Sequence, residues 1–225
     1  MWQSVDNIQI SSYLDVSSPR LFPLMLIDRK RSINANLLNP DKRDLAETIS
    51  LAKSMKIQDR CHFHTELIAD AQLTSASFDL ITSMSVIEHI VEDKEAIRTM
   101  WNLLKPGGKL LITLPCSAEA YEEHMNRNDY ELNNPSEDGY IFFQRFYDET
   151  LLMERIFSIT GKPTRYQIYG EKQSGTYQAN EFEKRTNPLH PYWRDPLQMG
   201  LLYEYKSSIS QMPGMGVIAL EFRKI

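Results

Sequence analysis

The strongest constraint on the fold is a helix that leads directly into a buried strand. Over 93–104, apolar residues recur at spacings of three and four, which predicts a helix with one apolar face. These residues are Ile97, Met100, Trp101 and Leu104. The sequence KPGG then ends the helix, and KLLITLP at 109–115 is almost continuously apolar. Such a strand is covered on both faces, so helices must pack on both sides of its sheet.

Strands and helices alternate through the whole first half of the chain. Short apolar or alternating segments predict strands at 11–16, 33–38, 61–68 and 77–83. A helix is predicted at 39–55, where Asn39 is a candidate N-cap and Pro40 occupies the first helical position. Units of this kind connect through right-handed crossovers, which build a mostly parallel sheet of the α/β class.

The second half contains two long segments without a clear core pattern. Residues 117–140 are polar and acidic, as in a lid or binding loop. A helix is predicted at 147–157, and strands at 165–170 and 216–222. No Gly/Ser-rich or Pro-rich linker separates two cores. We therefore expect one domain over 1–225, with a lid or insert at about 117–147 and a long insert at about 170–212.

Composition narrows the location and the partners of the protein. The net charge is −5 and no long basic stripe offsets it, which argues against nucleic acid as a partner. The first residues lack the pattern of a secretory signal, and no run approaches ~18 apolar residues. Cys61 and Cys116 lack metal-ligand spacing, and His62 and His64 lack a third ligand. We expect a cytoplasmic protein without a membrane span or a metal site.

Residues 77–115 carry an ordered set of motifs: the strand FDLI, a loop with the pair EH, a helix, and then LLKPGGKLLITLP. This set resembles class I S-adenosylmethionine-dependent methyltransferases, of the type 11/12-like kind. FFQRFYDETLL at 142–152 further resembles the branch that modifies sugars and other small metabolites. The resemblance implies a Rossmann-like, seven-stranded, mostly parallel sheet with helices on both faces and an antiparallel last strand. It also implies S-adenosylmethionine as cofactor, bound over the carboxyl ends of the first strands.

The turn after the first strand departs from the family pattern. In YLDVSSPRLF, Ser17, Ser18 and Pro19 replace a glycine-rich turn, and the first glycine of the chain is Gly107. Serine can present an N–H and a hydroxyl, and proline can fix a tight turn. The turn is therefore either a working variant or the remnant of a cofactor site.

The second strand departs as well, because family members end it in a carboxylate that takes both ribose hydroxyls. The matching position here is Leu37 or Leu38, which cannot accept a hydrogen bond, with Asn39 and Asp41 nearby. Asn39 is a weaker, neutral acceptor. Cofactor binding weakens by a few kcal/mol unless another group compensates, at ~1–3 kcal/mol per unpaired buried polar group.

The resemblance implies a set of cofactor contacts beyond the turn. Asp70 with Ala71, in ELIADAQL, matches the segment whose acidic residue meets the adenine ring. Asp15 either organises the turn, lies near the methionine amino group, or simply caps the turn. The complete predicted cofactor set is Asp15, Ser17, Ser18, Pro19, Asn39, Asp70, Ala71, Ser83 and Met84.

His89 is the candidate general base, because imidazole titrates near neutral pH. The alternative is that Glu88 and His89 form a scaffold pair that shapes the loop. Arg145 beside the lid could hold a carboxylate or phosphate, and polar-tipped side chains nearby suit sugar or phenolic substrates, with ordinary packing as the alternative. These side chains are Tyr121, His124, Tyr130, Tyr140 and Tyr147.

The sequence thus predicts an S-adenosylmethionine-dependent methyltransferase that acts on a hydroxyl of a small metabolite or sugar-type acceptor. Methyl transfer depends mainly on orientation and desolvation, so the lack of an obvious catalytic dyad does not oppose it. The first rival is a methyltransferase-like scaffold or partner subunit without a working cofactor site. A nicotinamide dehydrogenase needs the glycine-rich turn even more and is less favoured. A homodimer stays open.

Overall fold

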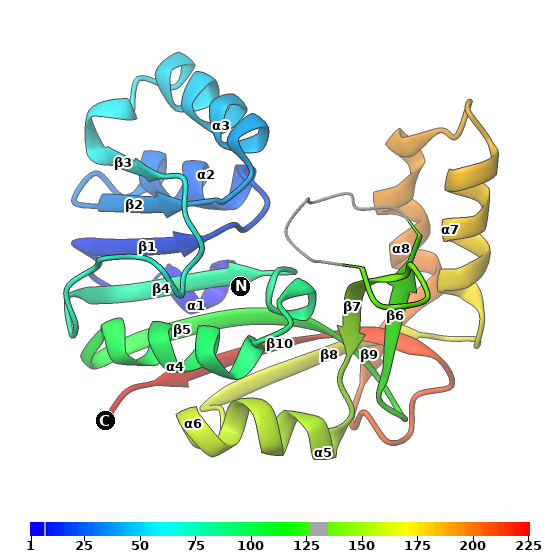
Figure 1. Ribbon diagram of the computed structural model, residues 1–225. Coiled ribbons are helices and arrows are strands. Elements are labelled where there is room, and N and C mark those ends of the chain that lie inside the picture. The colour runs from blue at the N-terminus through cyan, green and yellow to red at the C-terminus, as the bar shows by residue number, and fades with distance from the viewer. Residues whose placement is uncertain (7, 127–134) are drawn as a thin grey trace.

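The computed structural model describes residues 1–6, 8–126 and 135–225, and its centre is an eight-stranded sheet (Figure 1). The strand order is β3-β2-β1-β4-β5-β10-β8-β9. The first five of these strands are parallel, whereas β10 is antiparallel to both β5 and β8, and β9 is antiparallel to β8. The bounds are β1 Ser12–Val16, β2 Asn34–Leu38, β3 Cys61–His64, β4 Phe78–Met84, β5 Leu104–Ser117, β8 Arg165–Glu171, β9 Tyr203–Lys206 and β10 Met215–Arg223.

The predicted fold class is confirmed, with one strand more than expected. The final two predicted strands are β8 and β10, and β10 is the antiparallel strand beside β5. The additional strand, β9, comes from the insert at 170–212 and forms the outer edge of the sheet. Its pattern YEYK at 203–206 is too short to separate from a loop by sequence alone.

Helices cover both faces of the sheet, as the continuous apolar strand requires. On one face α1, α2 and α3 pack through side chains such as Val5, Leu24 and Ala52. On the other face α4 and the helix that begins at α5 pack through Ile97 and Ile156. The bounds are α1 Trp2–Val5, α2 Leu21–Arg29, α3 Lys42–Ser54, α4 Asp93–Leu103, α5 Glu149–Leu152, η3 Met153–Phe157 and α6 Ser158–Thr160.

Helix α3 begins later than predicted. Asp41, and not Asn39, is its N-cap, because the Asp41 carboxylate accepts from the N–H groups of Arg43 (2.8 Å) and Asp44 (3.3 Å). The Asn39 side-chain oxygen instead accepts from the Asp41 N–H at 2.9 Å. Pro40 therefore precedes the cap. The prediction failed because both residues are good caps and only the backbone path selects between them.

Strand β5 begins at once after α4, so KPGG lies inside it as an irregular start. Gly107 has φ +80°, and the register with β4 shifts between Phe78 and Leu80. A Cβ on Gly108 would lie 2.9 Å from the Lys105 carbonyl oxygen. The glycines thus allow the chain to turn from helix into strand without a loop.

Two segments extend beyond the sheet. Strands β6 (Tyr121–Met125) and β7 (Ile141–Phe146) pair as an antiparallel ribbon inside the predicted lid, and Tyr130 lies outside the described residues. The long insert forms α7 (Thr176–Thr186), η4 (Tyr192–Arg194) and α8 (Asp195–Leu202), which stand apart from the sheet at the right of Figure 1. Among the described residues, no helix has the length and apolar character needed to cross a membrane.

Candidate active site

A cleft of about 270 Å³ lies across the carboxyl ends of β1 and β2 and beside the loop that follows β4. The strand order reverses between β1 and β4, which is where open α/β sheets bind their ligands. We call it the strand-end cleft. Its lining residues are Val16, Ser17, Leu38, Asn39, Pro40, Asp41, Asp44, Leu67, Ile68, Ser85, Val86, His89 and Ile90.

Side-chain hydrogen bonds hold the turn after β1. The N–H and the hydroxyl of Ser17 both donate to the carbonyl oxygen of Leu38, at 2.8 and 3.1 Å. The Ser18 hydroxyl accepts from the Met84 N–H at 3.0 Å. Ser17 has φ +54°, a left-handed conformation that costs roughly 1–2 kcal/mol outside glycine. The turn therefore keeps the glycine-type backbone and is tied to both neighbouring strands.

Asp15 lies buried beneath this turn. Its carboxylate accepts from the Ser18 N–H at 3.0 Å, from the Thr82 hydroxyl at 2.5 Å and from the Tyr13 hydroxyl at 3.1 Å. Burial raises the pKa of Asp15 to about 6, although these hydrogen bonds oppose the rise. Asp15 thus organises the turn, and it does not line the strand-end cleft.

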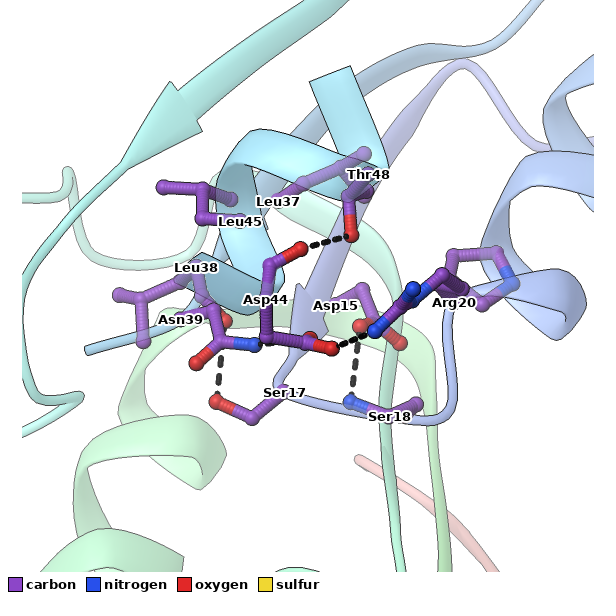
Figure 2. Close-up of a pocket in the computed structure, with 11 residues that line it drawn as sticks. Asp15, Ser17, Ser18, Arg20, Leu37, Leu38, Asn39, Asp44, Leu45 and Thr48 are labelled. Carbon is purple, nitrogen blue, oxygen red and sulfur yellow. Dashed lines mark hydrogen bonds and ion pairs between the residues drawn. The ribbon is translucent and has the colours of Figure 1, made fainter. Parts of the chain in front are cut away.

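Two carboxylates line the strand-end cleft at the start of α3, those of Asp41 and Asp44. Leu37 is buried in the core, and the Asn39 amide is engaged, because it donates to the Asp44 carboxylate at 2.7 Å. Asp44 lines the strand-end cleft and also pairs with Arg20 (Figure 2). Arg20 pairs with Glu47 as well. Sequence reasoning missed Asp44, since an acidic residue in a first helical turn is explained by the helix dipole alone.

A second, much smaller cavity lies between the turn and α3 (Figure 2). Asp15, Ser18 and Arg20 line it, and its volume is about 10 Å³. Such a space holds no more than about one water molecule. A ligand of the size of a nucleoside therefore has no room in this smaller cavity, whereas the strand-end cleft is large enough for it.

Several predicted residues lie outside the strand-end cleft. Asp70 and Pro19 are exposed, and Ala71 packs against the core. Ser83 and Met84 are buried in β4, where the Ser83 hydroxyl donates to the Val16 carbonyl oxygen at 3.2 Å. The structure therefore brings together Ser17, Asn39 and His89 from the predicted set, and adds the apolar residues Leu67 and Ile68. No pattern in the sequence distinguishes these two from ordinary core residues.

His89 lies in η2 (Ile87–His89), in the wall of the cleft. Its Nδ1 is 2.7 Å from the Phe143 carbonyl oxygen in β7, and a carbonyl can only accept. The proton of the neutral ring is thus on Nδ1, and Nε2 is the basic nitrogen. Burial lowers the pKa of His89, partly offset by its hydrogen bond to Phe143 and by the charge of Glu123. The neutral imidazole is favoured near pH 7.

Glu88, the neighbour of His89, is buried, and its Oε2 has no hydrogen-bond partner among the described residues. Burial raises the pKa of Glu88 to about 8. Glu88 is therefore largely protonated near pH 7. It does not line the strand-end cleft.

Arg145, for which the sequence leaves both a substrate contact and ordinary packing open, is engaged within the protein. It is buried, and its guanidinium donates to Asp93 at 2.7 Å and to Glu122 at 2.9 Å. Asp93 also accepts from the Tyr147 hydroxyl and from Arg155, each at 2.7 Å. This network joins α4 to β7, the strand whose Phe143 carbonyl holds His89.

Comparison with known proteins identifies the family to which this chain belongs. Residues 41–173, more than half of the chain, match the family described as "Methyltransferase domain". The chain belongs to the class I S-adenosylmethionine-dependent methyltransferases. This match begins at Asp41, the N-cap of α3, and includes η2 and β5, which carry the motifs EH and KPGG. The cleft residues of the β1 turn and the end of β2 lie upstream of it.

Individual methyltransferase relatives are distant. A "Ubiquinone biosynthesis O-methyltransferase" from Xanthomonas oryzae pv. oryzae (strain PXO99A) is 27% identical over 113 residues, which is 46% of this chain and 46% of that protein. The chain thus matches less than half the length of this curated relative. Among solved structures, the MccD protein superimposes with a TM-score of 0.64 at 14% identity, over 100% of this chain and 94% of that one. Geranyl diphosphate C-methyltransferase from Streptomyces coelicolor A3(2) gives a TM-score of 0.60 at 8% identity, over 96% and 70%. These two likenesses show the fold.

The residues of the strand-end cleft fit S-adenosylmethionine, the cofactor of the family. Leu38, Leu67 and Ile68 supply apolar walls of the kind that a flat heterocycle needs. The Asp44 carboxylate lines this cleft and would be the charged acceptor for ribose hydroxyls, and its two oxygens also accept within the protein, from Arg20 and from the Asn39 amide. Within the described part of the chain, no three His, Cys, Asp or Glu side chains are grouped so that they could hold a metal ion.

Proposed function

We propose that this methyltransferase-family protein transfers a methyl group to a hydroxyl of a small metabolite or sugar-type acceptor. The observation that carries the proposal is the position of His89 in the wall of the strand-end cleft, with its Nδ1–H donated to the Phe143 carbonyl oxygen. The distant likeness to an O-methyltransferase supports oxygen as the acceptor atom.

When bound, S-adenosylmethionine supplies a methyl group on a sulfonium, a good leaving group that keeps the electron pair of the broken carbon–sulfur bond. His89 Nε2 takes the proton from the acceptor hydroxyl as the new oxygen–carbon bond forms. The Phe143 carbonyl fixes the His89 tautomer, so this nitrogen is ready to act as a base. The apolar side chains around it, such as Val86 and Ile90, keep water from the reacting atoms.

In the same proposal, the cofactor is held by residues from three connections. Leu38, Leu67 and Ile68 contact the adenine ring, and Asp44 accepts from the ribose hydroxyls. Asp70 stays a predicted contact at the edge of that ring, because its N–H donates to the Leu67 carbonyl oxygen in the same turn. Ser17 is the proposed contact to the amino-acid end of the cofactor.

Calorimetric titration with S-adenosylmethionine and S-adenosylhomocysteine tests the binding site. We expect micromolar binding to the native chain and 10- to 100-fold weaker binding to Asp44→Ala, at ~1.5–3 kcal/mol for a hydrogen bond to a charged group. Glu47→Ala is the matched control, because Glu47 also pairs with Arg20 but does not line the cleft. Its affinity should change less than about threefold. An equal loss in both variants would contradict the role of Asp44.

Once an acceptor hydroxyl has been found by screening, His89→Gln tests the base. We expect kcat to fall by about 10²–10⁴ while the affinity for S-adenosylmethionine stays unchanged. The rate of the native protein should rise with pH below the ordinary His range, because the pKa of His89 is lowered by burial. An unchanged kcat in His89→Gln would remove His89 from the catalytic step.

The second candidate function is a methyltransferase-like scaffold that binds a partner and no cofactor. It is favoured by the turn at Ser17 and Ser18 and by Arg20, which fills the space between the turn and α3. The titration above separates the two candidates. No heat and no thermal stabilisation at millimolar S-adenosylmethionine would exclude the enzyme for this chain and leave the scaffold.

A further inference from the structure

The segment from α7 to α8 has its apolar side chains on the outside. Neither helix contains a buried residue. Every fourth residue from 189 to 201 is apolar and strongly exposed, and we call these four the apolar stripe. They are Leu189 (86% exposed), Trp193 (79%), Leu197 (69%) and Leu201 (71%). Because η4 runs directly into α8, this spacing places the last three on one side of the helical segment.

Charged groups, in contrast, connect the two helices to each other. Arg194 pairs with Glu183, and Asp195 lies 3.0 Å from His190 Nε2 and 3.6 Å from Lys184 Nζ. The partly exposed ion pairs of Lys184 and Arg194 contribute only ~0–1 kcal/mol each, whereas the His190 side chain is fully buried beside Asp195. The ion pairs within the segment therefore offset little of the free-energy cost of leaving the apolar stripe exposed to water.

The exposed area is large enough for a stable interface. Phe182 on α7 and Tyr192, the neighbour of Trp193 in η4, add exposed aromatic surface to the same segment and are 70% and 63% exposed. With ~150–250 Å² per aromatic side chain, the exposed parts of these two and Trp193 amount to roughly 400 Å². The three leucines of the stripe bring the surface close to the ~800 Å² per partner of a standard complex.

The charge of the segment indicates which kind of partner fits. Residues 176–206 contain four Lys or Arg and four Asp or Glu, so the segment is neutral although the whole chain carries −5. An anionic lipid surface selects an excess of cations, which this segment lacks. Because the segment carries no net charge, a second copy of it related by a two-fold axis would meet no net electrostatic repulsion.

We infer that the apolar stripe is the contact surface of a homodimer, in which a second copy of this chain covers it through a two-fold axis. Strand β9 continues the surface, because Tyr205 on this edge strand is also strongly exposed. The inference is independent of the proposed methyl transfer.

Light scattering coupled to size exclusion tests the inference on the full chain at about 5–100 µM. We expect twice the chain mass for the native protein and the single-chain mass for Trp193→Glu/Leu197→Glu. Because hot-spot residues dominate interfaces, the dissociation constant of this variant should rise at least ~30-fold. Leu21→Glu is the control, since Leu21 is an exposed apolar residue on α2 and should leave the dimer intact.

Two results would overturn the inference: a native protein that is monomeric at 100 µM, or a double variant that stays dimeric. Circular dichroism verifies that the double variant is folded, and Leu201→Glu provides a second, milder disruption. A monomeric native protein that floats with phosphatidylcholine/phosphatidylglycerol vesicles would identify a lipid surface as the occupant and also overturn the dimer. Activity and cofactor affinity do not enter these measurements.

Discussion

Two parts of this molecule use charged side chains in opposite ways. At the junction of α4 and β7, the carboxylate of Asp93 is fully buried and accepts from Arg145, Arg155 and Tyr147 inside an apolar surround. In the α7–α8 segment, partly exposed side chains such as Glu183 and Arg194 pair with each other while the apolar side chains face outward. The buried network around Asp93 holds α4 and β7 together. The α7–α8 segment exposes an apolar surface that a second molecule can cover.

The largest loss of stability should come from removing the buried carboxylate of Asp93. Asp93→Ala leaves two guanidinium groups and a hydroxyl without their acceptor, so we expect a loss of about 3–5 kcal/mol in the free energy of unfolding. Glu181→Ala, which removes the partly exposed ion pair with Lys184 (3.0 Å), is the matched variant in the α7–α8 segment and should lose less than about 1 kcal/mol. Urea denaturation of both variants measures the difference, and equal losses would contradict it.

Glu88 sharpens the comparison, because it is a buried carboxyl whose Oε2 has no partner among the described residues. The unfolded carboxyl ionises near 4.5, whereas the folded pKa is about 8. Below pH 4.5 the carboxyl is protonated in both the folded and the unfolded state, and Glu88 does not change the free energy of unfolding with pH. As the pH rises from 4.5 to 8, the folded state loses stability relative to the unfolded state, by at most ~1.4 kcal/mol per pH unit.

Glu88→Gln removes this titration. We expect the variant to be more stable than the native protein by about 2–4 kcal/mol at pH 8, and equally stable near pH 4.5. Thermal unfolding across this pH range is the measurement. Glu154→Gln, on an exposed position, is the control and should follow the native profile. A constant difference between Glu88→Gln and the native protein at all pH values would refute the assigned titration.

Substitutions at Ser17 should change the stability least. The hydroxyl hydrogen bond of Ser17 stabilises the turn, whereas its left-handed backbone destabilises it. Ser17→Ala keeps φ +54° and loses the hydroxyl bond to Leu38, so it should lose ~1 kcal/mol. Ser17→Gly loses the same bond but relieves the left-handed strain, and its stability should stay close to native. Chemical denaturation should rank glycine above alanine by about 1 kcal/mol. The reverse order would show that the backbone is not strained.

The sequence by itself determined the architecture. The helix at 93–104, the continuous strand after KPGG and the alternation upstream require a parallel sheet covered on both faces, because apolar periodicity is a local property that folding preserves. The resemblance of its motifs to the methyltransferase family also predicted that Ser17, Asn39 and His89 lie at one edge of the sheet. These three residues line the cleft.

Only the tertiary structure decided which polar groups are available in the site. Asn39 and Arg145 looked like ligand contacts, yet each is engaged by a carboxylate from another element, Asp44 and Asp93 respectively. Asp44 enters the cleft because α3 begins at Asp41, and the stripe at 189–201 stays outside because ion pairs occupy the space between α7 and α8. Hydrogen bonds and ion pairs between distant segments depend on how the elements pack in three dimensions, and a local sequence pattern does not predict them.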